Sequence, residues 1–217
     1  MLFRSADICH RRGALAIGGM TALYPSREDA ELNARALAVL EQDKRNEAAC
    51  FMDGAWTGHP DQNAIAVAQF PAPNQLASRP PAGERHPDLR PRPVGVGQRS
   101  VTGTRAAVRT VIRYRNGVHN GRGASLLDGY MEDLATDRIY RLMIAQRMKH
   151  RYTAPITDET GRAVAHMPEF VRGCFQAELA RLIEEQSRGR EAGSAATLRA
   201  AAAESQEMIA NGRFSPV

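Results

Sequence analysis

The spacing of apolar residues predicts helices for most of the chain, with two short apolar runs near the N-terminus. Residues 3–12 have the pattern of a helix end, and the apolar run 14–17 (Ala-Leu-Ala-Ile), closed by Gly18-Gly19-Met20, is typical of a buried parallel strand. A helix is expected over 26–49, capped by Ser26. Its apolar face comprises Leu32, Ala36, Val39 and Leu40. A second apolar run, 49–52, follows, so helix and strand alternate as in an α/β fold.

The composition changes between Pro71 and Pro93, where seven of the twelve prolines lie. This segment predicts an extended connector. Beyond it the pattern is helical, with helices expected over 103–116, 133–150, from Pro168 onward and over 195–211. The side chains expected to point inward are Val108, Val111, Ile112, Ile139, Leu142, Met143, Phe170, Val171, Cys174 and Leu182.

The chain therefore divides into an α/β part (1–70), a Pro-rich connector (71–102) and an all-α part (103–217). Two strands cannot form an independent parallel sheet, because both edges and both faces would need covering. Met1 also falls inside a helical pattern. We therefore expect the chain to be the C-terminal part of a larger protein.

Composition narrows the class of protein. The 217 residues are 43% hydrophobic and 24% charged, as in globular domains. No apolar run approaches the roughly 20 residues of a membrane span, and three cysteines without metal-ligand spacing indicate a reduced, cytoplasmic protein. The net charge of +5 comes without a basic block or a nucleic-acid-binding motif, so nucleic acid is a weak candidate. An anionic small molecule such as a CoA thioester fits the dispersed arginines better.

Two loops in the α/β part could bind a ligand. Gly18-Gly19-Met20 and residues 53–60 each follow an expected strand, and ligands of parallel α/β proteins bind at such loops. Trp56 offers a flat wall there. The alternative is that both loops are plain turns and that Trp56 is a core residue. His59 and His119 are isolated, and no residues stand at the spacing of metal ligands.

Glu132 and Asp133 lie where a glycine-rich loop meets a helix. A carboxylate at such a junction can be held in place with a lone pair free, as a general base requires. The alternative is that Asp133 only caps the helix and Glu132 is solvated.

Four blocks, taken in this order, resemble malate synthase, in particular its A-type isoform. They are FRSADICHRRGALAIGGM (3–20), EDAELNARALAVLEQDKRNEA (28–48), DGAWTGHP (53–60) and NGRGASLLDGYMEDLAT (120–136). The resemblance implies a TIM barrel followed by a helical C-terminal plug domain. Residues 1–70 would then be the last strand–helix units of the barrel, and 103–217 the plug.

The resemblance also implies an activity, the condensation of acetyl-CoA with glyoxylate and water to give malate and CoA, a step of the glyoxylate cycle. Asp133 matches the family's catalytic base, with Glu132 as a supporting neighbour. Substrate-binding residues by the same match are Trp56, Met20, Gly19 and Pro60. The family uses Mg2+, but its metal ligands and its enolate-stabilising arginine lie on earlier barrel strands, so no metal site is expected in this chain. We therefore do not expect the chain to turn over substrate alone.

Two other functions stay open at this point. A non-catalytic helical module that binds CoA-like anions or a protein partner would explain the net positive charge and the helical part. A nucleic-acid-binding protein is the weaker alternative, because its binding would rest on dispersed arginines alone.

Overall fold

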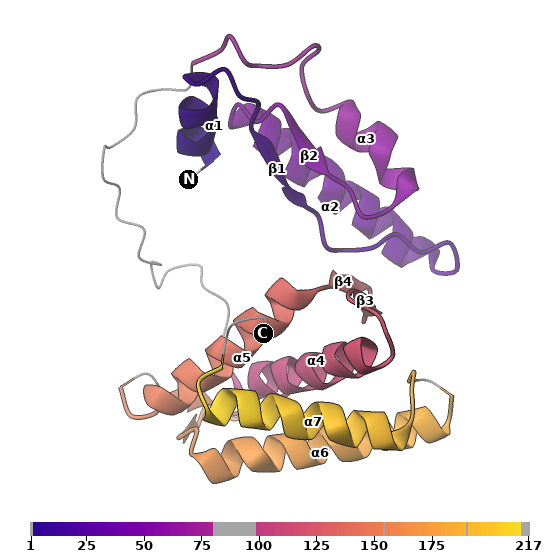
Figure 1. Cartoon of the computed structure of the whole chain (residues 1–217), viewed down its shortest axis with the longest axis vertical. Coiled ribbons are helices and arrows are strands. Elements are labelled where there is room, and N and C mark those ends of the chain that lie inside the picture. Colours follow the sequence, from indigo (N-terminus) through magenta and orange to yellow (C-terminus); the bar gives the residue numbers. More distant parts are fainter. Residues whose placement is uncertain (1, 80–98, 154, 190, 214–217) are drawn as a thin grey trace. The chain divides into compact units, whose positions relative to one another are not determined.

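Two compact units make up the chain in the computed structural model, which describes residues 2–79, 99–153, 155–189 and 191–213 (Figure 1). The first unit comprises Met1–Pro91 with Asp128–Met131, and the second comprises Arg92–Leu127 with Glu132–Val217. Most of the expected connector lies outside the described residues. Within the described part, no helix is long and apolar enough to cross a membrane.

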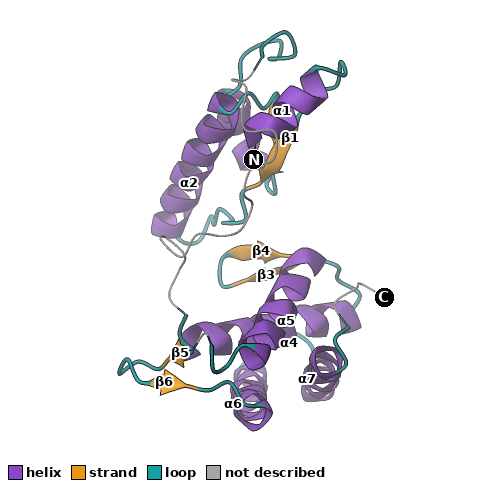
Figure 2. Cartoon of the chain, turned by 90° about the vertical axis from the view of Figure 1, so that its left-hand side faces the viewer, coloured by secondary structure: helices purple, strands orange, loops and turns teal. Residues whose placement is uncertain are grey.

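The first unit is built around one pair of parallel strands joined through a helix. Its elements are α1 (Leu2–His10), β1 (Ile17–Met20), α2 (Ala30–Ala49), β2 (Gly54–Trp56), the 3-10 helix η1 (Pro60–Gln62) and α3 (Asn63–Val67). Ile17 lies opposite Gly54 and Met20 opposite Trp56, with a bulge between the two pairs. α2 lies along one side of the pair, and Figure 2 shows it beside β1 from a second direction. Parallel pairing, which the alternating pattern predicted, is confirmed.

The prediction of a buried first strand was wrong. The strand begins at Ile17 rather than Ala14, and Leu15 and Ile17 are 51% and 60% exposed. Ala16 between them is buried with Ala6 and Met52 in a small core. Successive residues of a strand face opposite sides. Among the described residues of this unit, other side chains therefore pack against one side of the strand and leave the other side exposed.

Three details of the first helix–strand unit also differ from expectation. α2 starts after Asp29, whose carboxylate accepts the Leu32 N–H, while Ser26 caps only a preceding turn. The second apolar run, 49–52, ends the helix, and β2 begins only at Gly54. On α2, Val39 is 43% exposed although Ala36 and Leu40 are fully buried. Ser26 and Asp29 are both good caps, and the sequence does not decide between them.

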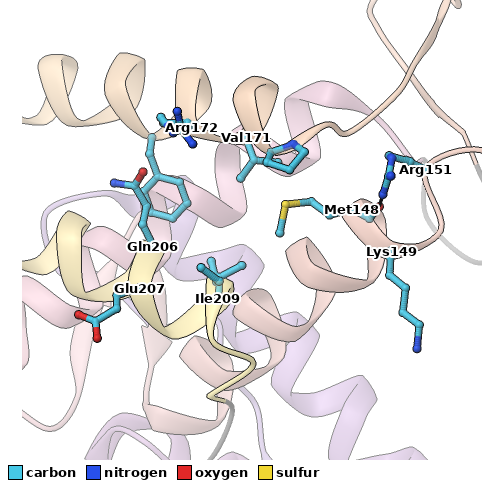
Figure 3. A pocket seen from close by; sticks show the side chains of 11 residues that line it. Met148, Lys149, Arg151, Val171, Arg172, Gln206, Glu207 and Ile209 are labelled. Atoms are coloured by element: carbon cyan, nitrogen blue, oxygen red, sulfur yellow. Dashed lines mark hydrogen bonds between the residues drawn. The ribbon is translucent and has the colours of Figure 1, made fainter.

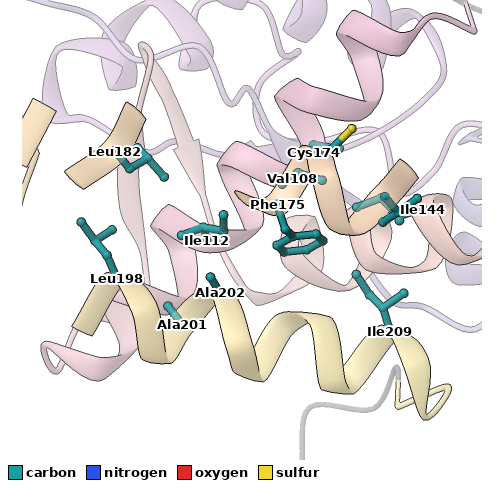
Figure 4. Packing of buried hydrophobic residues seen from close by; sticks show 12 residues of the cluster. Val108, Ile112, Ile144, Cys174, Phe175, Leu182, Leu198, Ala201, Ala202 and Ile209 are labelled. Atoms are coloured by element: carbon teal, nitrogen blue, oxygen red, sulfur yellow. The ribbon is translucent and has the colours of Figure 1, made fainter. Parts of the chain in front are cut away.

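The second unit is a bundle of four helices with short strands in its loops. Its elements are α4 (Val101–His119), β3 (Ser125–Leu127), β4 (Tyr130–Glu132, shared with the first unit), α5 (Leu134–Lys149), β5 (Ile156–Thr157), β6 (Ala163–Val164), α6 (Pro168–Ser187) and α7 (Ala195–Ala210). The expected helices and the Pro168 start are confirmed. Figure 4 shows the core, where Val108 and Ile112 of α4 face Phe175 of α6 and helix α7.

The inward face of α5 was predicted wrongly. Ile139 and Leu142 are 61% and 39% exposed, and Met143 is only partly buried. The buried positions are Asp137, Arg141 and Ile144. Their spacing of four and three residues is that of a core face, but two of the three side chains are charged.

Ion pairs join α4 to α6 and to the segment that follows α6. Three arginines spaced four residues apart on α4 meet three glutamates at distances of 2.6, 2.7 and 2.6 Å. The pairs are Arg105–Glu178, Arg109–Glu185 and Arg113–Glu191. A part of the arginine excess is therefore used within the bundle rather than held free for an anionic ligand.

Candidate active site

Asp133 caps helix α5 with one of its two carboxylate oxygens. Oδ1 accepts the N–H groups of Ala135 at 2.8 Å and Thr136 at 3.4 Å. Oδ2 has no hydrogen-bond partner among the described residues, and the residue is exposed. The cap and the base are thus compatible, because the cap fixes the carboxylate and leaves one oxygen accessible.

A buried charge network holds the first turn of α5 directly behind that cap. The carboxylate of Asp137 is fully buried and accepts Arg115 Nη2 of α4 at 2.8 Å and Arg141 Nε at 3.0 Å. Arg115 also reaches Glu204 of α7 at 3.4 Å. The network therefore joins three helices at the end of α5 that carries Asp133.

Tyr114 lies next to this network and is 3% exposed. Its burial, followed by the negative charge of Asp137 and, more weakly, of Asp133, raises the pKa of the Tyr114 phenol above its ordinary value. Its hydroxyl donates to the Gly123 carbonyl at 3.2 Å, in the glycine-rich loop. The phenol therefore stays neutral and ties that loop to α4.

In the first unit, side chains of α2 hold the backbone of Gly19. Its N–H donates to Glu47 Oε1 at 3.1 Å, and its carbonyl accepts from Lys44 Nζ at 2.6 Å. Lys44 is fully buried, and its Nζ lies 3.2 Å from Glu47 Oε2. The prediction that Gly18-Gly19-Met20 is a loop after the first strand was wrong, because these residues form β1 itself. The N–H of Gly19 is engaged by Glu47 and is therefore not free to bind a ligand.

The structure brings Met20 together with the loop after β2. The Met20 sulfur would lie 3.1 Å from a Cβ atom added at Gly58, so the side chain rests on that glycine. Trp56, opposite Met20 in the strand pair, is 67% exposed and is therefore not a core residue of this unit. Pro60 is exposed at the first position of η1, where His59 provides the cap. Glu132, at the end of β4, is half-buried.

Asp53, the first residue of the 53–60 block, has a structural role. Its carboxylate lies 2.8 Å from His10 Nε2 and accepts the N–H groups of Ala16 at 2.8 Å and Gln75 at 2.7 Å. Burial raises the pKa of Asp53, but the three hydrogen bonds outweigh it and leave the pKa below the ordinary value. His10 therefore helps to hold this part of the fold together.

Sequence reasoning missed the two buried charge groups, Lys44–Glu47 and Arg115–Asp137–Arg141. A signal was present in each case. Lys44 continues the buried positions Ala36 and Leu40 at a spacing of four residues. A charged residue at core spacing indicates a buried partner, because an unpaired buried charge is very costly.

No magnesium site can be assembled from the part of the chain that the structure describes. Those residues contain no group of three histidine, cysteine or carboxylate side chains able to hold a metal ion. The residues present therefore do not fit a Mg2+ ion, and we assign no step of a reaction to one.

The sequence matches two family models in succession. Residues 4–85 match "Malate synthase, TIM barrel domain" and residues 98–212 match "Malate synthase, C-terminal". The malate synthase of Streptomyces clavuligerus is 39% identical over 81% of this chain and 32% of its own length. The glyoxysomal malate synthase of Zea mays is 34% identical over 82% of this chain and 32% of its own length. Malate synthase A of Escherichia coli is 36% identical over 67% of this chain and 28% of its own length. The chain thus spans about a third of the length of these relatives, and it belongs to the malate synthase family.

Proposed function

We propose that this chain supplies the catalytic base and part of the substrate pocket of a malate synthase, which condenses acetyl-CoA with glyoxylate and water. The observation that carries the proposal is the geometry of Asp133, in a sequence block that matches the family's motif. Oδ1 is anchored by two backbone N–H groups, and Oδ2 has no partner among the described residues.

For this reaction, the position of the base matters more than its strength. The methyl group of a thioester is a very weak acid, and a carboxylate is intrinsically a weak base for removing its proton. Positioning has to compensate, and well-oriented groups contribute several kcal/mol in this way. In our proposal Asp133 Oδ2 takes the methyl proton, and Glu132 supports the same loop–helix junction.

The first unit supports the second half of the proposal. A parallel strand pair joined through a helix is the repeating unit of a TIM barrel, whose ligands bind beyond the carboxyl ends of the strands. Leu15, just before β1, and Ile17, at its start, are both exposed apolar side chains, and they fit the layered interior of such a barrel. We propose that residues 1–70 belong to the barrel, that 103–217 form the helical plug, and that Trp56, Met20 and Pro60 line the substrate site.

The alternative of a module that binds CoA-like anions without catalysis has less support from the second unit. Arginines 105, 109, 113, 115 and 141 all form ion pairs within it. The net positive charge of the chain therefore does not by itself indicate a broad anion-binding surface.

A fusion protein tests the proposed function. Residues 4–212 replace the matching third of the Streptomyces clavuligerus enzyme, and CoA release from acetyl-CoA is followed with glyoxylate and Mg2+. The unfused 217-residue chain is assayed in parallel, and we expect no turnover from it alone. In the fusion, Asp133→Asn is expected to lower kcat by about 100-fold or more, with KM changed by less than about threefold. Glu132→Gln is expected to have a smaller effect.

Asp29→Asn is the matched control. Asp29 is likewise an exposed carboxylate that caps a helix, α2, through Oδ1. Asparagine is an equally good cap, so neither substitution should cost stability. An Asp133→Asn enzyme that is as active as the Asp29→Asn enzyme would show that Asp133 is only a cap.

A further inference from the structure

A cavity lies in the helical unit at the end of α5 far from Asp133. It has a volume of about 630 Å³ and lies where α5 and α7 end and α6 begins (Figure 3). That volume is within the range of small-molecule sites, roughly 300–1,000 Å³. The 16 residues of α5 place this end about 24 Å from the cap at Asp133. The proposed reaction therefore leaves this cavity without a role.

The floor of the cavity is apolar. Met148 of α5, Val171 and Phe175 of α6 and Ile209 of α7 line it, and the last three are 5%, 1% and 6% exposed. These side chains also belong to or pack against the core of the bundle, which fixes their positions. An apolar ligand body would therefore meet a preformed surface.

The rim of the cavity carries three cations and one carboxylate. Lys149 and Arg151 lie on one side of the opening and Arg172 on another, with Glu207 on α7. Lys149 and Arg172 have no ion-pair partner among the described residues, unlike the arginines of α4 that face α6. The surplus of positive charge at this rim is thus available to a ligand.

One further feature favours an anion at the same place. Arg151 Nη1 donates to the Met148 carbonyl at 2.8 Å, but its buried Nε has no acceptor in the described part of the chain. A buried donor without a partner gains from a nearby anionic oxygen.

We infer that this cavity binds an amphipathic monoanion, a carboxylate carried on an unbranched or aromatic apolar body. The apolar floor takes the body, and the positive charge of the rim attracts the carboxylate. A ligand of this class needs both parts of the site, which separates it from inorganic phosphate and from neutral hydrocarbons.

The test is a titration of the 15N-labelled 217-residue chain with sodium octanoate, followed by NMR. Saturable shifts are expected at the amides of Met148, Val171 and Ile209, with a Kd on the order of 1 mM, as small ligands of this size give. 1-Octanol is expected to bind several-fold more weakly, while n-octylammonium and inorganic phosphate should give no saturable shifts there. Equal binding of octanoate and 1-octanol would overturn the inference, because the cations would then contribute nothing.

Variants of the rim test the anion recognition directly. Lys149→Gln and Arg172→Gln change exposed side chains, and each is expected to weaken octanoate binding about threefold to fivefold, as for exposed ion pairs. Arg199→Gln, an exposed arginine at the other end of α7, is the matched control and should leave the Kd unchanged. A double variant at Lys149 and Arg172 with the parent Kd, in a chain whose spectrum shows the parent fold, would also refute the site.

Discussion

The buried network behind Asp133 should dominate the stability of the helical unit. Among the described residues, Asp137 is the one carboxylate that both Arg115 and Arg141 contact, and its side chain is fully buried with that of Arg141. Asp137→Asn keeps the shape but removes the counter-charge of Arg141 and leaves Arg115 only Glu204, at 3.4 Å. Breaking a buried ion pair by removing one partner costs about 3–5 kcal/mol. We expect a loss in that range for the helical unit.

Urea denaturation followed by circular dichroism at 222 nm measures this loss. With a slope of about 1–3 kcal/mol per molar urea, the midpoint of the helical transition should fall by at least about 1 M. Trp56 is the sole tryptophan and lies in the first unit. Its fluorescence therefore reports on the first unit separately, and its midpoint should be nearly unchanged.

An exposed pair on α6 provides the control. Glu184 and Arg188 are 59% and 58% exposed, so Glu184→Gln should cost between about 0 and 1 kcal/mol. Arg115→Gln should fall between the two, because Arg141 still faces Asp137 in that variant. If Asp137→Asn costs no more than Glu184→Gln, the reasoning is refuted, since the carboxylate would then not be a buried charge in the folded chain.

Two predictions concern the first unit, and both are read by Trp56 fluorescence in urea. A Cβ atom at Gly18 would collide with the buried carboxylate of Glu47, so Gly18→Ala should cost about 1–3 kcal/mol, whereas Gly19→Ala meets nothing within 4 Å and should cost clearly less. Equal losses would show that Glu47 is not fixed against the strand. The folded-state pKa of Asp53 lies below its ordinary value of 3.8, so its contribution is present above that pH and is lost as pH falls below it toward the lowered pKa. Asp53→Asn should make the unit less stable at neutral pH and should reduce the loss of stability at acid pH. The same loss of stability at acid pH in this variant would contradict the stabilising role of the Asp53 carboxylate.

The helical unit could largely be predicted from the sequence because its signals are local. Val108, Val111 and Ile112 repeat at the helical period and are all fully buried, and Pro168 starts α6 as expected. The prediction failed on α5, where hydrophobicity pointed to Ile139 and the true core face contains Asp137. That face depends on Arg115, which is 22 residues away in sequence, and no local pattern shows the pairing.

The first unit was less predictable because its strands depend on contacts beyond their own residues. The apolar run before Gly18 indicated a buried strand, yet Ile17 is 60% exposed. Hydrophobicity indicates that a strand tends to be buried but not what buries it, and the described residues of this unit leave one face of β1 uncovered. The hydrogen bonds of the Gly19 backbone could not be predicted either, because their partners are Lys44 and Glu47 in the next helix.

Asp133 illustrates why the cap and the base could not be separated by sequence alone. Both roles require an aspartate at the start of a helix, so the same block satisfies either one. The geometry removes the conflict, because the N–H groups of Ala135 and Thr136 both bind Oδ1. A carboxylate fixed through one oxygen loses rotational freedom before substrate arrives, and this is the entropic part of what a positioned base contributes. A carboxylate is intrinsically a weak base for a thioester methyl group, and the cap contributes only position, so the proposed reaction also requires groups that stabilise the enolate as it forms.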